Sequence, residues 1–364
     1  MVDEVALRAA IGRVEDPEIH RSLNDLNMVR ELDVGSDGNV RVLVALTVPG
    51  YQLKDQLEAD VAAAISSVPG TGAALVEFTV MSDADRAELQ ALLGGGPNTS
   101  REVRIDMRTR VLAIASGKGG VGKSSVTTNL AVALADLGKT VGVIDADVWG
   151  FSIPKMLGID RNPTVIEQMI IPPEAHGVRV MSMDYFVQDD QAVIWRGPML
   201  HKALEQFLVD VYWGDLDYLL LDLPPGTGDV SISISQFLPR AQMVVVTTPQ
   251  LTAQRVAKRA GLMAEKVNQE VLGVIENMSF FTGNDGVRYD IFGSGGGAAL
   301  AEQLGVPLLG QIPLLSAMRE GADTGKPVLV AAPDSESATA FRAIAESVEA
   351  LKPRLRAHPE LIIS

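Results

Sequence analysis

Nine consecutive residues read Ser116-Gly117-Lys118-Gly119-Gly120-Val121-Gly122-Lys123-Ser124. They fit the phosphate-loop pattern G-x-x-x-x-G-K-[ST], which is informative only between a strand and a helix. Both are expected here, because Val111–Ala115 is an apolar run of strand length and apolar residues then recur at helical spacing as far as Gly138. Strand, loop and helix would turn backbone N–H groups and the positive helix end toward phosphates. This context disfavours the alternative, a glycine-rich turn without a ligand.

The residues of the loop have distinct expected roles. Lys123 is expected to reach the β- and γ-phosphates of a nucleotide, and the Ser124 hydroxyl is expected to ligate Mg²⁺. The nucleotide-binding residues that we expect are Gly117, Lys118, Gly119, Gly120, Val121, Gly122, Lys123, Ser124 and Ser125.

Two apolar segments downstream end in aspartates. Asp145 and Asp147 close the first, and Asp222 closes the second just before a Pro-Pro-Gly turn. Carboxylates at strand ends beside a phosphate loop can hold Mg²⁺ and the attacking water. We expect Asp222 to hold Mg²⁺ through water, Asp145 to support the metal ligands, and Asp147 to position or activate the hydrolytic water. One aspartate could merely cap a strand end, but three in register with the loop indicate an Mg²⁺-dependent nucleotide hydrolase, for which the resemblance described below implies ATP.

Beyond residue 110, apolar segments of strand length alternate with helical segments. Such near-continuous apolar strands predict a parallel sheet covered on both faces. With phosphates at the carboxyl ends of its strands, this is a doubly wound, mostly parallel α/β P-loop NTPase domain, expected over residues 107–364. The remaining strands are expected at Val141–Asp145, Val178–Met183, Tyr218–Asp222, Met243–Thr247, Val271–Ile275 and Leu308–Ile312.

Residues 1–83 predict a small α+β domain of their own, and residues 84–106 predict a linker. The linker contains a short helical piece, Asp85–Leu93, followed by a Gly-Gly-Gly-Pro run that is typical of a flexible connection. The elements expected in the small domain are a helix from Glu4 to Ile11, strands at Val29–Val34 and Val40–Val48 joined at Asp37-Gly38, a helix carrying Leu53, Leu57, Val61 and Ile65, and a strand from Ala74 to Val80.

Composition narrows the classes of partner. The 364 residues carry a formal net charge of −15 and only 5% aromatic residues, which disfavours nucleic acid as a partner. No apolar run is long enough to cross a bilayer and no basic signal region begins the sequence, so we expect a cytoplasmic protein without a membrane partner. There is no cysteine, which excludes disulfides and thiolate metal sites, and the 4 histidines show no ligand spacing.

One residue inside the loop indicates which class of P-loop protein this is. Lys118 directly follows the first glycine, a position without a chemical role in an ordinary phosphate loop. The spelling GKGGVGKS resembles the deviant loop of the MinD/ParA and nitrogenase iron-protein superfamily. That resemblance implies a homodimer closing on ATP, in which Lys118 reaches the partner's nucleotide and acts in catalysis with Lys123 and Asp147. Otherwise Lys118 would be a solvated surface cation.

A more specific resemblance covers nearly the whole chain. It is similar to the Mrp/ApbC family of ATPases, iron–sulfur cluster carriers whose partners are iron–sulfur apoproteins or assembly factors. By this resemblance Asn277 contacts the adenine and the loop at Pro313 walls the base. The N-terminal part resembles the MIP18-like domain linked to iron–sulfur assembly. The sequence motifs that carry the resemblance to the Mrp/ApbC family are Asp145–Gly150, Trp195–Met199, Asp222–Asp229, Thr248-Pro249-Gln250 and Glu276–Ser279. Those that carry the resemblance to the MIP18-like domain are Asp16-Pro17-Glu18, Asp25–Val29 and Val48-Pro49-Gly50.

The chain departs from the family at the cluster ligands. The family has a C-x-x-C pair after Glu276–Ser279, which in a dimer would hold a [4Fe–4S] cluster, and a cysteine near the position of Tyr51. This chain has Phe280–Gly286 and Tyr51 there, and clusters require thiolates. We therefore interpret the protein as an ATP-gated carrier or assembly factor without cluster-ligating cysteines. The alternative is a nucleotide-switched interaction or partitioning ATPase of the MinD/ParA type with no cluster role.

Overall fold

The computed structural model describes residues 2–94, 103, 105–147, 150–186, 197–226, 229–267 and 269–351. Several residues of the motifs above lie outside the described residues: Val148, Trp149, Trp195, Arg196, Thr227 and Gly228, together with the glycine-rich residues 95–100. The chain forms two compact units. The first comprises Met1–Arg104, Arg161–Glu174 and Gln206–Gly214, and the second comprises Ile105–Asp160, Ala175–Glu205 and Asp215–Ser364.

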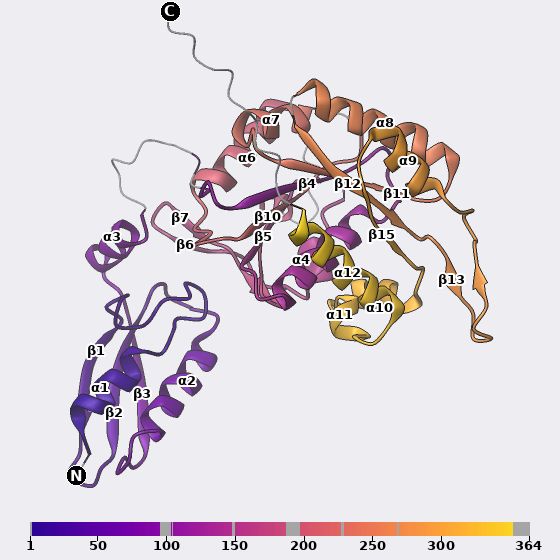
Figure 1. The fold of residues 1–364 in the computed structure, drawn as a ribbon. Helices are drawn as coiled ribbons and strands as arrows, with labels where there is room; N and C mark the ends of the chain where they lie inside the picture. Colours follow the sequence, from indigo (N-terminus) through magenta and orange to yellow (C-terminus); the bar gives the residue numbers. More distant parts are fainter. Residues whose placement is uncertain are drawn as a thin grey trace, which may run out of the picture. The chain divides into compact units, whose positions relative to one another are not determined.

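An eight-stranded sheet with the order β15-β12-β11-β4-β10-β5-β9-β8 organises the second unit (Figure 1). The first seven strands of that order are all parallel to their neighbours, so the predicted parallel sheet is confirmed. The eighth strand, at the edge, was not expected from the sequence. The strands are β4 (Arg110–Ser116), β5 (Val141–Asp145), β8 (Glu174–Ala175), β9 (Val178–Ser182), β10 (Tyr218–Asp222), β11 (Gln242–Thr247), β12 (Glu270–Asn277) and β15 (Leu308–Ile312).

Helices cover both faces of this sheet, which explains why β5, β10 and β11 are buried along their whole length. Helices α4 (Lys123–Asp136) and α12 (Glu336–Ala350) lie on one face, and α8 (Leu251–Lys266) and α9 (Gly296–Leu304) lie on the other (Figure 1). The remaining elements are α5 (Ile153–Met156), a 3₁₀ helix (Met183–Phe186), α6 (Gly197–Val209), α7 (Asp229–Phe237), the hairpin β13 (Phe281–Thr282) with β14 (Arg288–Tyr289), α10 (Ser316–Thr324) and α11 (Val328–Ala331).

Helix α4 follows the phosphate loop and ends where the sequence predicts. Gly138 has a φ of +77°, and its N–H donates to the Ala135 carbonyl while the Lys139 N–H donates to the Leu134 carbonyl. This pair of bonds is a Schellman ending, which needs a left-handed residue and therefore favours glycine. Most of the helix between Val126 and Leu134 is buried, so it forms part of the core.

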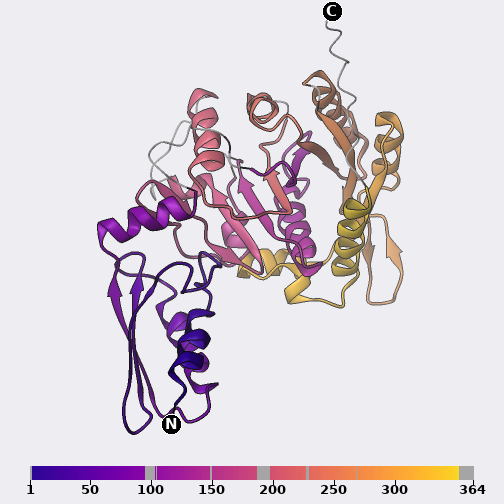
Figure 2. The same cartoon turned by 60° about the vertical axis from the view of Figure 1, so that its left-hand side comes forward.

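A three-stranded sheet of β1 (Val29–Val34), β2 (Val40–Leu46) and β3 (Ala74–Val80) forms the centre of the first unit. Helices α1 (Glu4–Gly12) and α2 (Lys54–Ser66) cover one face of it (Figure 2). They bury apolar residues at helical spacing against the sheet, and every element predicted for residues 1–83 is present. The buried helix residues include Leu7, Ile11, Leu57, Val61 and Ile65.

The first unit extends beyond the predicted domain. Helix α3 (Asp83–Leu92), which the sequence places in the linker, buries Leu89 in the same apolar core. The hairpin β6 (Thr164–Ile166) with β7 (Met169–Ile171) also adds its apolar side chains to that core. Thr164 donates to the Glu18 carboxylate at 3.1 Å. This unit therefore includes a segment that the sequence assigns to the NTPase domain. No helix in the described part of the chain is both long and apolar enough to span a membrane.

Candidate nucleotide-binding site

Strand register assembles the acidic part of the site. Strand β10 lies between β4 and β5, and its last residue, Asp222, stands opposite Asp145 of β5 and Ile114 of β4. Because all three strands are parallel, the phosphate loop that follows β4 leaves the sheet at the same edge as both aspartates. The sequence predicts this arrangement, and the structure confirms that these strand ends are adjacent.

A buried ion pair lies at the centre of the site. The Lys123 Nζ is 2.7 Å from Oδ2 of Asp222 and 3.3 Å from Oδ2 of Asp147. The side chain of Lys123 is 6% exposed and that of Asp222 is 0% exposed. A charge this deeply buried is tolerated only with a partner of opposite charge, and the Lys123 ammonium provides that partner for Asp222 and Asp147.

Two hydroxyl groups complete the environment of Asp222. Ser124 Oγ donates to Oδ2 at 2.6 Å, and Thr127 Oγ1 donates to Oδ1 at 2.7 Å. Thr127 is fully buried and did not figure among the residues expected from the sequence. The sequence feature that could have predicted its place in the site is its spacing from Lys123. A polar residue four positions later lies one helical turn further along the same face of α4.

Asp145 is held by the chain that follows it. Its Oδ2 accepts from the backbone N–H groups of Ser152 at 3.1 Å and Ile153 at 3.3 Å, and its Oδ1 accepts from the N–H of Asp147 at 3.3 Å. Burial, and then the nearby charge of Asp222, raise the pKa of the Asp145 carboxyl above its ordinary value. Asp145 therefore fixes the start of the loop that carries Asp147.

The glycine loop packs against Asn277 on its inner side and is open on its outer side. Gly122 has a φ of +77°, and a Cβ there would collide with the side-chain amide of Asn277. The same amide donates to the Val121 carbonyl at 2.9 Å, which ties the loop to the end of β12. At Gly119 and Gly120 an added Cβ would meet nothing within 4 Å. The loop is therefore uncrowded on its outer side at these two glycines.

The remaining expected residues lie around this loop. Lys118 Nζ donates to the side-chain oxygen of Gln250 at 3.1 Å. The Ser125 carbonyl accepts from Asn129 at 2.9 Å, inside α4. The Pro313 carbonyl accepts from Ser337 at 3.2 Å, so this proline is anchored to α12. The Ile312 carbonyl accepts from Ser279, two residues beyond Asn277.

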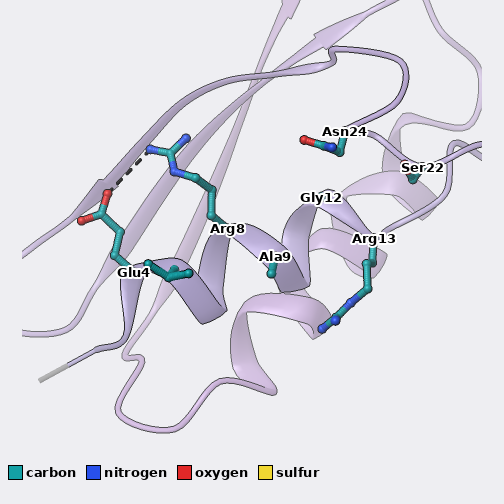
Figure 3. Close-up of a pocket in the computed structure, with 8 residues that line it drawn as sticks. Glu4, Arg8, Ala9, Gly12, Arg13, Ser22 and Asn24 are labelled. Carbon is teal, nitrogen blue, oxygen red and sulfur yellow. Dashed lines mark ion pairs between the residues drawn. The ribbon is translucent and has the colours of Figure 1, made fainter.

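A separate cavity of about 560 Å³ lies in the first unit, along helix α1 (Figure 3). Arg8 in its wall forms an ion pair with Glu4 at 3.6 Å. The lining contains no residue of the phosphate loop or of the aspartates around it, so this cavity has no part in the chemistry described above. The lining residues are Glu4, Val5, Arg8, Ala9, Gly12, Arg13, Ser22 and Asn24.

The segment that stands in place of the family's cysteine pair is a hairpin (β13–β14) that extends away from the sheet (Figure 1). Phe281 pairs with Tyr289, and the Tyr289 hydroxyl donates to Asp285 at 2.8 Å in the turn. The Arg288 guanidinium lies 3.6 Å from the ring centre of Phe280. Among the described residues, no group of three or more histidines and acids is placed to hold a metal ion.

Comparison with known proteins agrees with this geometry. Residues 107–349 match the family described as NUBPL iron-transfer P-loop NTPase. The chain belongs to this family. Residues 4–78 match a second family, described as iron-sulfur cluster assembly protein. The second unit of this NUBPL-type protein is therefore a P-loop NTPase domain.

Curated relatives match this NUBPL-type protein over most of its length. A Mycobacterium tuberculosis protein named iron-sulfur cluster carrier protein is 50% identical over 354 residues, 94% of this chain and 92% of the relative. One of the same name from Deinococcus radiodurans is 46% identical over 346 residues, 94% of each chain.

Solved structures share the fold of the NTPase domain. A nucleotide-binding protein from Archaeoglobus fulgidus in complex with ADP is 33% identical with a TM-score of 0.55, covering 71% of this chain and 97% of that one. The cell division ATPase MinD of Pyrococcus furiosus is 25% identical with a TM-score of 0.50, covering 66% of this chain and 98% of that one.

Proposed function

We propose that this protein is a cytoplasmic ATPase that acts as an ATP-gated homodimer in iron–sulfur cluster delivery or assembly. The observation that carries the proposal is the constellation around Asp222: an ammonium group and two hydroxyls converge on one buried carboxylate beside the N-terminus of α4. Membership of an iron-transfer NTPase family supports the cluster role.

In this proposal the residues of the loop bind and orient the triphosphate. The backbone N–H groups from Gly117 to Ser125 and the positive end of α4 surround the phosphates. Lys123 exchanges its carboxylate partners for the β- and γ-phosphates, and Asp147, released from Lys123, orients the attacking water. Lys118 contributes its charge to the nucleotide of the second copy. Asn277 contacts the adenine, and Pro313 walls it.

The residues present fit a magnesium ion. Mg²⁺ prefers oxygen ligands and is usually held by one or two carboxylates together with phosphates and water, so an all-protein cage is not required. Ser124 and Asp222 would hold the ion, and Asp145 would support that shell. When bound, Mg²⁺ neutralises the charge that develops on the phosphates. Thr127 keeps the Asp222 carboxylate oriented toward the loop.

The iron–sulfur cluster is the cargo in this proposal, and this chain does not hold it alone. Without cysteine it cannot supply the thiolates that a [4Fe–4S] cluster needs. We therefore propose that the protein acts on an apoprotein or assembly factor that carries the thiols. In this proposal the first unit, which contains residues 1–83, serves as an assembly domain, and the second unit serves as the ATPase. The N-terminal match favours this role over a partitioning ATPase.

Cluster delivery tests the proposal. A [4Fe–4S]-loaded donor is mixed anaerobically with an apo-aconitase acceptor, with and without this protein, and with Mg-ATP or a non-hydrolysable analogue. We expect acceptor activation to accelerate only with Mg-ATP, while the re-isolated protein contains no stoichiometric iron. Iron retained stoichiometrically on this chain would contradict the missing-ligand interpretation. An unchanged rate with every donor, alongside active ATP hydrolysis, would instead support the nucleotide-switched alternative.

A further inference from the structure

The two lysines of the phosphate loop have different kinds of partner. Lys123 contacts two carboxylates, whereas Lys118 donates to the neutral side-chain amide of Gln250 at 3.1 Å. Both Lys118 and Gln250 are partly buried, so the contact is partly shielded from water. A neutral acceptor orients an ammonium group without cancelling its charge. The Lys118 contact is therefore one that an anionic phosphate can displace.

The topology explains why Gln250 meets this lysine. Strands β4 and β11 are adjacent and parallel, and Val246 stands opposite Ser116 in their register. The chain segments that leave these strands therefore emerge side by side at the carboxyl edge of the sheet. Gln250 immediately precedes helix α8, and its carbonyl accepts from the Ala253 N–H, which fixes its backbone. Ser116 Oγ donates to the Lys118 carbonyl at 3.1 Å, which fixes the other side.

We propose that Gln250 is a positioning residue that holds Lys118 within its own protomer and releases it to the triphosphate. The release step rests on the dimeric ATPase proposed above, but the contact itself does not. In this account a carboxylate at position 250 would hold Lys118 too strongly. An apolar side chain of the same length would leave Lys118 free at all times. The two replacements should therefore act in opposite directions, which a merely structural role would not produce.

Chemical labelling of Lys118 tests the contact in the full-length protein without nucleotide. Acetylation by limiting acetic anhydride is followed by mass spectrometry in wild type, Gln250→Met and Gln250→Glu. Because one hydrogen bond is at stake, we expect labelling about three- to tenfold faster in Gln250→Met and slower by a similar factor in Gln250→Glu. Gln303→Glu, which adds the same charge at an exposed position of α9, should match wild type. Equal labelling of all four proteins would overturn the proposal.

Turnover tests whether Gln250 acts through Lys118. We expect Gln250→Glu to lower kcat for Mg-ATP about tenfold, the size of one charge-assisted hydrogen bond. Because Lys118→Ala is expected to bind nucleotide without turning it over, the same replacement made in that background is read by its affinity for a non-hydrolysable ATP analogue. This affinity should be unchanged, because there is no ammonium left to hold. A loss of affinity there would show that the carboxylate acts on the nucleotide directly, and would overturn the proposal. If wild type hydrolyses no ATP, the proposed function fails, and the labelling result still decides the contact.

Discussion

The ammonium group of Lys123 lies 2.7 Å from Oδ2 of Asp222, and both side chains are buried. This contact joins the residue expected to bind phosphate to the residue expected to hold Mg²⁺. Since the residues are 99 positions apart in sequence, the sheet is what brings them together. The ammonium group gives the buried Asp222 carboxylate a cationic partner, a role that the Mg²⁺ accompanying a triphosphate would take over.

Removing Lys123 should affect both turnover and stability. In Lys123→Ala we expect kcat to fall at least about 100-fold, as for loss of one group that stabilises transition-state charge. Loss of the ammonium group beside the buried Asp222 carboxylate should lower the free energy of unfolding by roughly 3–5 kcal/mol. A phosphate-release assay measures kcat, and urea unfolding measures the free energy of unfolding. Lys139→Ala, which breaks an ion pair with Glu349 nearer the surface, is the control and should change the free energy of unfolding far less, because water screens that pair. Full turnover in Lys123→Ala would remove this residue from the mechanism.

Asp222→Asn should keep nucleotide binding but abolish the stimulation of hydrolysis by Mg²⁺. The amide removes the negative charge that faces Lys123 and that would hold the ion. We expect nucleotide affinity in EDTA to be kept or increased, because Lys123 loses its competing partner, while added Mg²⁺ no longer stimulates hydrolysis. Calorimetric titrations of ATP with and without Mg²⁺ show the difference. A magnesium dependence equal to that of wild type would be incompatible with the role given to Asp222.

The hydroxyl of Thr127 should matter through Asp222. Thr127→Val keeps the volume but deletes the 2.7 Å bond, so we expect a loss of about 1–3 kcal/mol in the free energy of unfolding and a weaker affinity for Mg²⁺. The neighbouring Thr128 is equally buried but reaches only the Met156 sulfur, at 3.7 Å. Thr128→Val is therefore the matched control, with a smaller effect on stability and none on Mg²⁺. Indistinguishable variants would show that the bond to Asp222 is unimportant.

Gly122 and Gly138 offer a comparison of backbone strain with steric collision. Both have a φ of +77°, but a Cβ at Gly122 would strike the Asn277 amide, whereas one at Gly138 would meet nothing within 4 Å. Gly138→Ala should cost about 1–2 kcal/mol in stability from strain alone and leave nucleotide affinity intact. Gly122→Ala should cost more and also weaken nucleotide binding, as measured by titration with a fluorescent ATP analogue. Equal nucleotide affinity in the two variants would count against the Asn277 contact.

Much of this architecture could be predicted from the sequence because its signals are local. Buried parallel strands read as apolar runs, and the aspartates ending two of them, Asp145 and Asp222, lie together as expected. Contacts that depend on how distant segments pack could not be predicted. No local sequence pattern predicts that Gln250 contacts Lys118. Nor does one predict that the hairpin Thr164–Ile171 packs in the core of the first unit. The position of Thr127 could have been predicted from the sequence, because helical spacing from Lys123 places it on the same face of α4.

The homodimer that closes on ATP is the central claim, and sedimentation velocity tests it most directly. Wild type and Lys118→Ala are each run without nucleotide and with Mg²⁺ and a non-hydrolysable ATP analogue. We predict that wild type changes from monomer to dimer only with the analogue, and that Lys118→Ala binds the analogue but stays monomeric. The same association state for wild type with and without the analogue would contradict the account.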